Sequence, residues 1–394
     1  MRYRKVLSSC QIALLCNFGF ALLVLAVFGV QVAFADPLPN PAKISASIGY
    51  VGDEDTYTFT VNAGETIQIR MADTSVTGDL RPYLALYSPS GAYIAQGTGA
   101  FFDPVAGFSY TASETGTYRV VAADYYSANT GSYNLYFARM PGANEHGALI
   151  NDGVHAGQID LGDLDTYTFV ANAGETVQIR MADTSESGNL HPYLVLYSPS
   201  GAYIARGNNT FFDPVAGFTY TASETGNYTV LAADYYMSNT GSYNLYFARM
   251  PGANEHGALV NNGVYAGQID LGDLDTYTFV ANAGDTVQVQ MTDTSVTGEL
   301  TPILNLYSPS GEPIALGGSS YGDPVASFTY IAAETGTYTV LAASRYFPNI
   351  GSYELAFQTD GVVAEPVPAL SLWGLVALSA LLMWIGGRRI GHKK

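Results

Sequence analysis

Hydrophobic and polar residues alternate along most of this chain with a period of two. In the segment DTYTFVA at 165–171, Tyr and Phe alternate with Thr, and in TVQIRMA at 176–182, Val, Ile and Met alternate with Gln and Arg. Successive side chains of a β-strand point to opposite faces, so this period predicts strands with one face in a core. Further segments of the same kind are 193–198, 217–222, 227–233 and 242–248.

Turn-forming residues separate these predicted strands. NAGE, SPSG, SETG and SNTG lie between them, and in SPSG the residues Pro199 and Gly201 suit the second and fourth positions of a type I turn. About eight short strands in roughly a hundred residues are typical of an antiparallel sandwich or jelly roll. No helical period appears between the two ends of the chain. The predicted fold class is therefore all-β.

One phrase occurs three times along the chain. LGDLDTYTFVANAG at 161–174 recurs letter for letter at 271–284, and VGDEDTYTFTVNAG at 51–64 is close to both. The copies stand 110 residues apart, which is longer than the 20–50 residues of solenoid repeats. A unit of this size can bury its own core. We therefore predict three tandem antiparallel β-sandwich domains, repeats 1, 2 and 3, over residues 36–140, 141–250 and 251–360.

Both ends of the chain carry apolar stretches that predict targeting segments. The basic start MRYRK, a long apolar run and the small-residue pattern at 33–35 predict a signal peptide over residues 1–35. An uncleaved anchor helix is the alternative. In the tail, residues 361–394, the apolar span 369–387 of about 19 residues is long enough for a transmembrane helix. The basic residues after it should stay cytoplasmic.

Charge and cysteine content narrow the possible partners. The formal net charge is −18 at pH 7, and seven of the sixteen Lys and Arg residues lie at the two ends. An acidic surface repels phosphates, so we expect no nucleic-acid partner. Cys10 and Cys16, the only cysteines, lie in the predicted signal peptide. The mature chain would then contain no disulfide and no thiolate metal site.

The sequence contains no recognisable catalytic motif. H-E-x-x-H, G-x-S-x-G and P-loop patterns are absent. Among the histidines of the three repeats, only His146 and His256 occupy equivalent positions, both in NEHG. The recurring acids Asp73, Asp103 and Glu114 stand in turn-like contexts, which favours solvated loop acids over a glycosidase pair. We therefore predict a protein that is not an enzyme and has no catalytic residues.

The tail resembles a known sorting signal. Its stretch VPALSLWG is similar to the P-x-L-S-x-W-G core of the IPTL-CTERM signal, although VPAL stands where that family usually has IPTL. The matching residues are Pro368, Leu370, Ser371, Trp373 and Gly374, followed by the Arg pair Arg388 and Arg389. The resemblance implies an exported protein of a Gram-negative bacterium, held at the membrane or released when a sorting protease processes the tail. A plain C-terminal anchor is the alternative.

The order of motifs within each repeat resembles the bacterial pre-peptidase C-terminal domain family. Repeat 2 contains GQIDLGDLDTYTF, AGETVQI, LVLYSPSG, TGNYTV and GSYNL in this order, over nearly its whole length. The resemblance implies a jelly-roll type of β-sandwich. It also implies a non-catalytic accessory of secreted hydrolases, a family in which some members bind calcium or polymers such as collagen. No hydrolase sequence accompanies the repeats in this chain.

The same resemblance implies a calcium site. In calcium-binding members, acids from the segment that enters the domain meet the Asp pair of the GD-x-D turn. The matching residues are Glu145, Asp163 and Asp165 in repeat 2 and Glu255, Asp273 and Asp275 in repeat 3. Carboxylate oxygens suit Ca²⁺, whereas repeat 1 has no entering acid after Asp36. The alternative is that these Asp residues only form Asx turns with backbone amides.

Two functions remain open at this stage. The first is a structural or adhesive stalk of the cell envelope or surface. The second is a calcium-dependent module that binds a carbohydrate or protein and assists a secreted hydrolase. The pairs Tyr125–Tyr126 and Tyr235–Tyr236 would each turn one ring outward, toward an extracellular polysaccharide or protein, or else pack across strands. A stalk keeps its fold without calcium, and a calcium-dependent binder does not.

Overall fold

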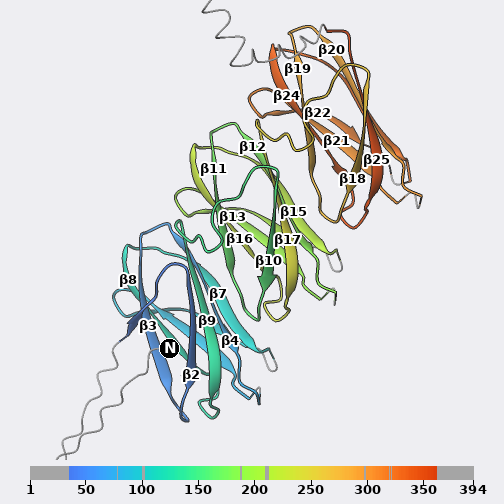
Figure 1. The fold of residues 1–394 in the computed structure, drawn as a ribbon. Coiled ribbons are helices and arrows are strands. Elements are labelled where there is room, and N and C mark those ends of the chain that lie inside the picture. The colour runs from blue at the N-terminus through green and yellow to red at the C-terminus, as the bar shows by residue number, and fades with distance from the viewer. Residues whose placement is uncertain are drawn as a thin grey trace, which may run out of the picture. The chain divides into compact units, whose positions relative to one another are not determined.

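The computed structural model describes residues 35–361, except 78, 100–102, 187–188, 209–212, 297–298, 319 and 321. This part of the chain is all-β, with no helix among the described residues, and forms three repeated sandwiches of two sheets each (Figure 1). The predicted fold class is confirmed. The predicted signal peptide, transmembrane span and sorting motif lie outside the described residues. Within the described part, no helix could cross a membrane.

Each repeat contains one set of short strands. Repeat 1 holds β1 (Asp36–Pro37), β2 (Ala42–Ile48), β3 (Glu54–Val61), β4 (Thr66–Asp73), β5 (Pro82–Tyr87), β6 (Tyr93–Thr98), β7 (Val105–Thr111), β8 (Gly116–Asp124) and β9 (Gly131–Met140). Repeat 2 holds β10 (Gly153–Ile159), β11 (Asp165–Ala171), β12 (Thr176–Asp183), β13 (Pro192–Tyr197), β14 (Tyr203–Asn208), β15 (Val215–Thr221), β16 (Gly226–Asp234) and β17 (Gly241–Met250). Repeat 3 holds β18 (Gly263–Ile269), β19 (Asp275–Ala281), β20 (Thr286–Asp293), β21 (Pro302–Tyr307), β22 (Pro313–Gly318), β23 (Val325–Ile331), β24 (Gly336–Ser344) and β25 (Gly351–Thr359).

The strand order is the same in every repeat. Repeat 2 pairs β10-β17-β12-β15 in one sheet and β11-β16-β13-β14 in the other, and repeat 3 follows the same order with β18-β25-β20-β23 and β19-β24-β21-β22. Repeat 1 has β2-β9-β4-β7 and β1-β3-β8-β5-β6, where β1 adds in parallel to β3. Most chain neighbours thus lie in opposite sheets, as in jelly rolls. The domain bounds at 140/141 and 250/251 stay predictions.

Each sandwich has its own apolar core between its two sheets. In repeat 2, Ile179 and Met181 of β12 meet Leu194 of β13, and none of the three side chains is accessible to solvent. The ring of Phe169 stacks on Tyr228, with 5.3 Å between the centroids. The side chains that the period of two assigned to the core therefore lie in it.

Neighbouring repeats share a second, smaller core, which we call a junction. Junction 1–2 brings together Ala72, Val105, Tyr136, Ala138, Met140, Ala143, Leu164, Val195, Tyr197, Leu231 and Ala233. Junction 2–3 brings together Ala182, Val215, Tyr246, Ala248, Met250, Ala253, Leu274, Tyr307, Leu341 and Ala343. Every position of junction 2–3 has its equivalent in junction 1–2, 110 residues earlier. Side chains that a single sandwich would leave on its outer faces are buried between repeats instead.

Strand β11 is buried on both faces, unlike the predicted strand with one face in a core. Tyr167 and Phe169 face the core of repeat 2, but Thr166 and Thr168 on the other face are also buried. The segment that enters the repeat covers them: the backbone N–H of His146 donates to the carbonyl of Thr166 at 3.0 Å, and Ala148 forms a parallel bridge with Thr168. The entering segment is therefore fixed to the strand that begins with Asp165.

The turn at Gly201 packs against the preceding repeat. Gly201 has φ +85°, and a Cβ there would overlap the carbonyl of Met140. Gly91, its equivalent in repeat 1, has φ +84° but open space around it. Gly91→Ala should cost about 1–2 kcal/mol for the left-handed backbone alone, and Gly201→Ala should cost clearly more. Urea unfolding of the full chain measures both variants. Equal costs would contradict the packing of this turn on Met140.

Candidate metal centre

The entering segment and the GD-x-D turn bring three potential ligands together in repeat 2. One ligand atom each from Glu145, His146 and Asp165 lies within 4.8 Å of the other two. Glu145 and His146 are exposed, whereas Asp165 is only 2% exposed at the start of β11. Repeat 3 builds the same cluster from Glu255, His256 and Asp275.

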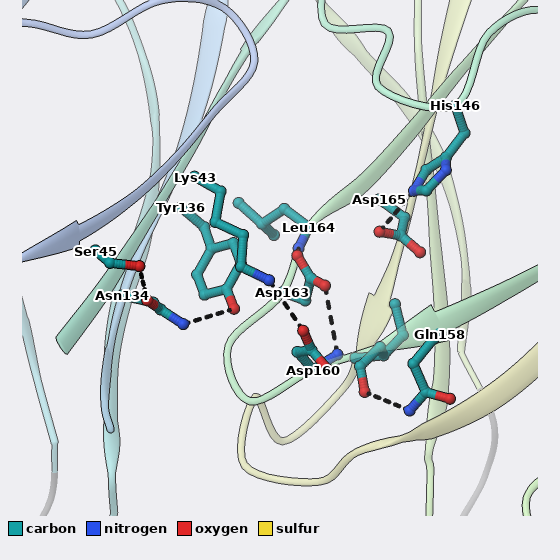
Figure 2. Close-up of polar contacts among 11 residues, drawn as sticks. Lys43, Ser45, Asn134, Tyr136, His146, Gln158, Asp160, Asp163, Leu164 and Asp165 are labelled. Carbon is teal, nitrogen blue, oxygen red and sulfur yellow. Dashed lines mark hydrogen bonds and ion pairs between the residues drawn. The ribbon is translucent and has the colours of Figure 1, made fainter. Parts of the chain in front are cut away.

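Both carboxylate oxygens of Asp165 have partners. The imidazole Nε2 of His146 lies 2.9 Å from Oδ1 (Figure 2), and the hydroxyl of Tyr243 donates to Oδ2 at 2.5 Å. Tyr243 also lies 2.7 Å from the hydroxyl of Tyr167. Because the hydroxyl of Tyr243 donates its single proton to Asp165, the hydroxyl of Tyr167 must be the donor to Tyr243. Asp165 thus terminates a buried chain of two tyrosines, which holds its carboxylate in place.

Asp163 lies beside this cluster but points into its own turn. Its Oδ1 accepts the N–H of Leu164 at 2.9 Å, and its Oδ2 accepts the N–H of Asp160 at 3.4 Å (Figure 2). Both contacts are with backbone amides near the turn, at positions i+1 and i−3, whereas an Asx turn uses the amide two residues on. The three-residue cluster therefore holds two of the predicted ligands of repeat 2, Glu145 and Asp165, and the third, Asp163, lies close enough to interact with Asp165 by charge.

Burial and neighbouring carboxylates raise the pKa values of the acids in the cluster. Burial, followed by the nearby Asp165 carboxylate, raises the pKa of Asp163 to about 6. The same causes raise the pKa of Glu145 above its usual range. The ammonium of Lys43 in repeat 1 opposes this effect, because it lies 2.9 Å from Asp160, next to the turn (Figure 2). A bound cation would relieve the same repulsion.

The repeat 3 cluster lies next to Asp152 of repeat 2, whereas the repeat 2 cluster lies next to Lys43 of repeat 1. Asp152 accepts the hydroxyl of Thr276 at 2.8 Å and the N–H of Asn254. Burial, then Asp273 and Asp275, raise the pKa of Glu255 to about 7, and Asp152 adds to this effect. Burial and Asp275 raise the pKa of Asp273 to about 6, and burial raises that of Asp275.

Repeat 1 does not have this arrangement among its described residues. Asp55 accepts the hydroxyl of Tyr133 at 2.7 Å, as Asp165 does from Tyr243. Asp53 accepts the N–H of Gly49 at 2.8 Å. Strand β1 occupies the place of the entering segment, and within the described part of the chain such a group of three potential ligands occurs only in repeats 2 and 3. The missing entering acid therefore separates repeat 1 from the other two.

Some members of the site were not predicted from the sequence. The sequence identifies His146 and His256 only as equivalent histidines, and their shared position in NEHG is the one signal of a common role. The tyrosines Tyr243 and Tyr353, which donate to Asp165 and Asp275, come from the GSYNL and GSYEL motifs. Their role depends on β17 and β25 lying across the sandwich from β11 and β19, which the chain order does not reveal.

The paired tyrosines differ from the expectation of one outward ring and agree in part with the alternative of packing across strands, since Tyr125 contacts Tyr83 and Tyr235 contacts Tyr193. Tyr125 and Tyr126 are 50% and 54% exposed, and Tyr235 and Tyr236 are 43% and 42% exposed. Both rings of each pair face solvent, because β8 ends at Asp124 and β16 ends at Asp234, so the pairs lie in turns where strand alternation no longer applies. The two rings of each pair contact each other edge to face.

The donor set fits a hard cation only in part. Glu145, Asp165 and the adjacent Asp163 offer the carboxylate oxygens that Ca²⁺ takes. His146 offers a nitrogen, which suits Zn²⁺ better than Ca²⁺. A calcium ion at Oδ1 of Asp165 would share this oxygen with His146, which draws negative charge away from it, so the histidine and the cation compete for the same oxygen.

Comparison with known proteins supports one family. Residues 53–124, within repeat 1, match the family model described as the bacterial pre-peptidase C-terminal domain, which confirms the resemblance read from the motifs. Repeats 2 and 3 have the same strand order as repeat 1. No curated protein matches the chain. The resemblance of the tail to a sorting signal stays a prediction.

Solved structures show only slight likeness to the whole chain. The pre-peptidase C-terminal domain of a collagenase from Bacillus anthracis is 21% identical, with a TM-score of 0.23, and covers 26% of this chain and 95% of its own. PliG of Aeromonas hydrophila, a periplasmic inhibitor of g-type lysozyme, is 17% identical, with a TM-score of 0.22, over 27% of this chain and 96% of its own. At such TM-scores these likenesses carry no conclusion about this chain.

The raised pKa of Asp163 predicts a pH dependence of stability. Because the folded pKa of about 6 lies above the ordinary value of 3.8, the folded state binds the proton more tightly. The stabilisation is therefore complete below pH 4 and is lost as the pH rises through 6. In metal-free buffer, Asp163→Asn should reduce the stability difference between pH 4 and pH 7 by about 1–3 kcal/mol. Urea unfolding at both pH values measures it, with the exposed Glu224→Gln as control. An unchanged difference in Asp163→Asn would contradict the assignment.

Proposed function

Since residues 53–124 match the bacterial pre-peptidase C-terminal domain family, we propose that this chain is a non-catalytic, exported protein of the bacterial cell envelope. Its three sandwiches act as a structural or adhesive stalk. The three repeats contain no cysteine, so their fold needs no disulfide wherever it forms, and the predicted tail would hold the stalk at the membrane.

The burial at the two junctions carries this proposal. Leu164 and Leu274 are each 3% exposed between repeats, although both stand in turns. Domains joined only by flexible linkers swing freely, whereas apolar interfaces restrict such motion. Three docked sandwiches can therefore hold a ligand or a further domain at a fixed distance from the anchor, which is what a stalk requires.

A distance measurement between repeats 1 and 3 tests the stalk. Val76 and Val296 are equivalent, fully exposed positions and accept spin labels as Val76→Cys and Val296→Cys, with Cys10 and Cys16 replaced by Ser in the full chain. Electron–electron double resonance should give one narrow distance distribution, and EDTA should not broaden it. A broad distribution would show that the repeats move independently and would contradict the stalk.

The candidate ligand clusters support a second function, a calcium-dependent binding module. Glu145, Asp163 and Asp165 would hold the ion in repeat 2, and Glu255, Asp273 and Asp275 in repeat 3. Calcium would supply positive charge among acids whose pKa values are raised by burial and mutual repulsion. Such a module would present its surface to an extracellular polysaccharide or protein and assist a secreted hydrolase.

Calcium titration of the full chain tests this second function. Two sites with Kd near the 10⁻⁴–10⁻³ M of extracellular modules should stabilise the chain by about 0.4–1.4 kcal/mol each in millimolar calcium. Calorimetry and thermal melts in EDTA and in calcium measure binding and stabilisation. The double variant Glu145→Gln/Glu255→Gln should lose both effects.

The controls separate a metal site from a general charge effect. Glu224→Gln removes the same charge from an exposed position outside the cluster and should leave the titration unchanged. His146→Ala should keep or strengthen calcium binding in repeat 2, because it removes the competitor for Asp165. The absence of binding heat and of a melting shift in the unaltered chain would eliminate the calcium module and leave the stalk.

A further inference from the structure

The two junctions use the same contacts at equivalent positions. Gln68 donates to the hydroxyl of Tyr197 at 3.1 Å, and Gln178 donates to Tyr307 at 2.8 Å. Each junction therefore joins an exit face of one repeat to an entry face of the next. The exit face of repeat 1 consists of Gln68, Arg70, Ala72, Tyr136 and Ala138. The entry face of repeat 2 consists of Leu164, Tyr197, Leu231 and Ala233, with Thr229 on the same face of β16 as Leu231.

A buried arginine connects the exit face to the GD-x-D turn. Arg70 is 5% exposed and donates to the carbonyl of Asp163 at 3.1 Å. Arg180 repeats this contact with Asp273 at 2.9 Å, and its guanidinium also lies 4.9 Å from the ring centroid of Phe347. The arginine thus receives a backbone acceptor only when a further repeat is docked.

The exit face of repeat 3 has different residues at these positions. Gln290, Thr292, Ala356 and Gln358 stand where the earlier repeats have Arg, Ala, Tyr and Ala. Gln290 and Gln358 are exposed and line a groove on this face together with Gln288. The inward residues of the same strand remain apolar, since Val287, Val289 and Met291 are at most 1% exposed. The change is therefore confined to the outer face.

The entry face of repeat 1 is altered in a complementary way. Glu54 stands in the place of the buried Leu164 and Leu274 and is exposed. Arg119 stands in the place of Thr229, which is 0% exposed and lies on the same face of β16 as Leu231. Docking an exit face here would bury a carboxylate and a guanidinium among apolar groups, which is unfavourable without partners.

Arg119 also covers the tyrosine that a docking repeat would need. Tyr87 is the equivalent of Tyr197 and Tyr307, whose hydroxyls accept the glutamine of the preceding repeat. The guanidinium of Arg119 lies 3.9 Å from the centroid of the Tyr87 ring. The ring is therefore occupied within its own repeat, as a cation–π pair.

We propose that the two outer faces are caps that prevent a second copy of this chain from docking end to end. An entry face and an exit face on one molecule form a heterologous pair, which extends into open filaments unless something blocks it. Arrays of repeats end in units with a polar outer face for the same reason. The two faces would thus keep the array of three described repeats from extending through a second copy.

Removing the caps tests this proposal. The entry variant carries Glu54→Leu and Arg119→Thr, and the exit variant carries Gln290→Arg, Thr292→Ala, Ala356→Tyr and Gln358→Ala. The full chain is purified in a mild non-ionic detergent, because its tail predicts a membrane span, and its mass is followed by light scattering at rising concentration. The unaltered chain and each single-end variant should keep a constant mass. In a mixture of the two single-end variants, one changed exit face can dock on one changed entry face, so the mass should approach twice that of the single chain. The mass of the chain with both ends changed should rise further with concentration, because each copy can dock at both ends.

Two results would overturn the proposal that these faces are caps. One is a mass of the unaltered chain that rises with concentration. The other is a constant mass for the fully changed chain when its thermal melt shows that it is folded. If that chain does not fold, the reciprocal variant Leu164→Glu/Thr229→Arg decides, because it places the cap residues inside junction 1–2. It should broaden the distance distribution between labels at Val76→Cys and Val296→Cys, and an unchanged narrow distribution would reject the proposal.

Discussion

The position of the GD-x-D turn against the preceding repeat is the constraint on which the rest of the structure depends. In repeat 2 this turn packs Leu164 into junction 1–2 and offers the carbonyl of Asp163 to the buried Arg70. Hydrogen bonds to a charged donor are among the stronger ones, with net values of about 1.5–3 kcal/mol. Gly162, at φ +76°, lets the turn lie directly on Ala72. One short turn therefore joins two sandwiches.

The same turn presents the candidate ligands, so the junction and the cluster share their scaffold. Asp163 offers its backbone carbonyl to Arg70, and its carboxylate points into its own turn, where it interacts with Asp165 by charge. The entering segment, fixed to β11 through Thr166, brings Glu145 and His146 to the same place. Ligand residues that stand about twenty positions apart in the chain are thus held by backbone contacts rather than by a flexible loop.

One difference between the copies of the repeated phrase, Glu54 against Leu164 and Leu274, follows from their position in the array. Repeats 2 and 3 each dock on a preceding exit face through Leu164 or Leu274. Repeat 1 has nothing before it among the described residues, and it carries the exposed Glu54 at this point. Repeat 3 keeps an apolar interior but has glutamines on its exit face. Identity in the middle and divergence at the outer faces therefore have one physical cause, the burial or exposure of the same surface.

The sequence by itself determined the strands, the all-β class and the threefold repetition, whereas the meeting of Glu145 with the Asp pair of the next turn is an implication of the family resemblance. Alternation of apolar and polar residues records which face of a strand enters its own core, and this was enough to place residues such as Ile179 and Phe169. It did not reveal that Arg180 and Thr166 are buried, because both were assigned to the polar face. Only the tertiary structure decided that, since a neighbouring repeat covers Arg180 and the entering segment covers Thr166. A polar side chain can be buried wherever a partner meets its hydrogen-bonding groups, and a pattern along one strand contains no information about what docks on its outer face.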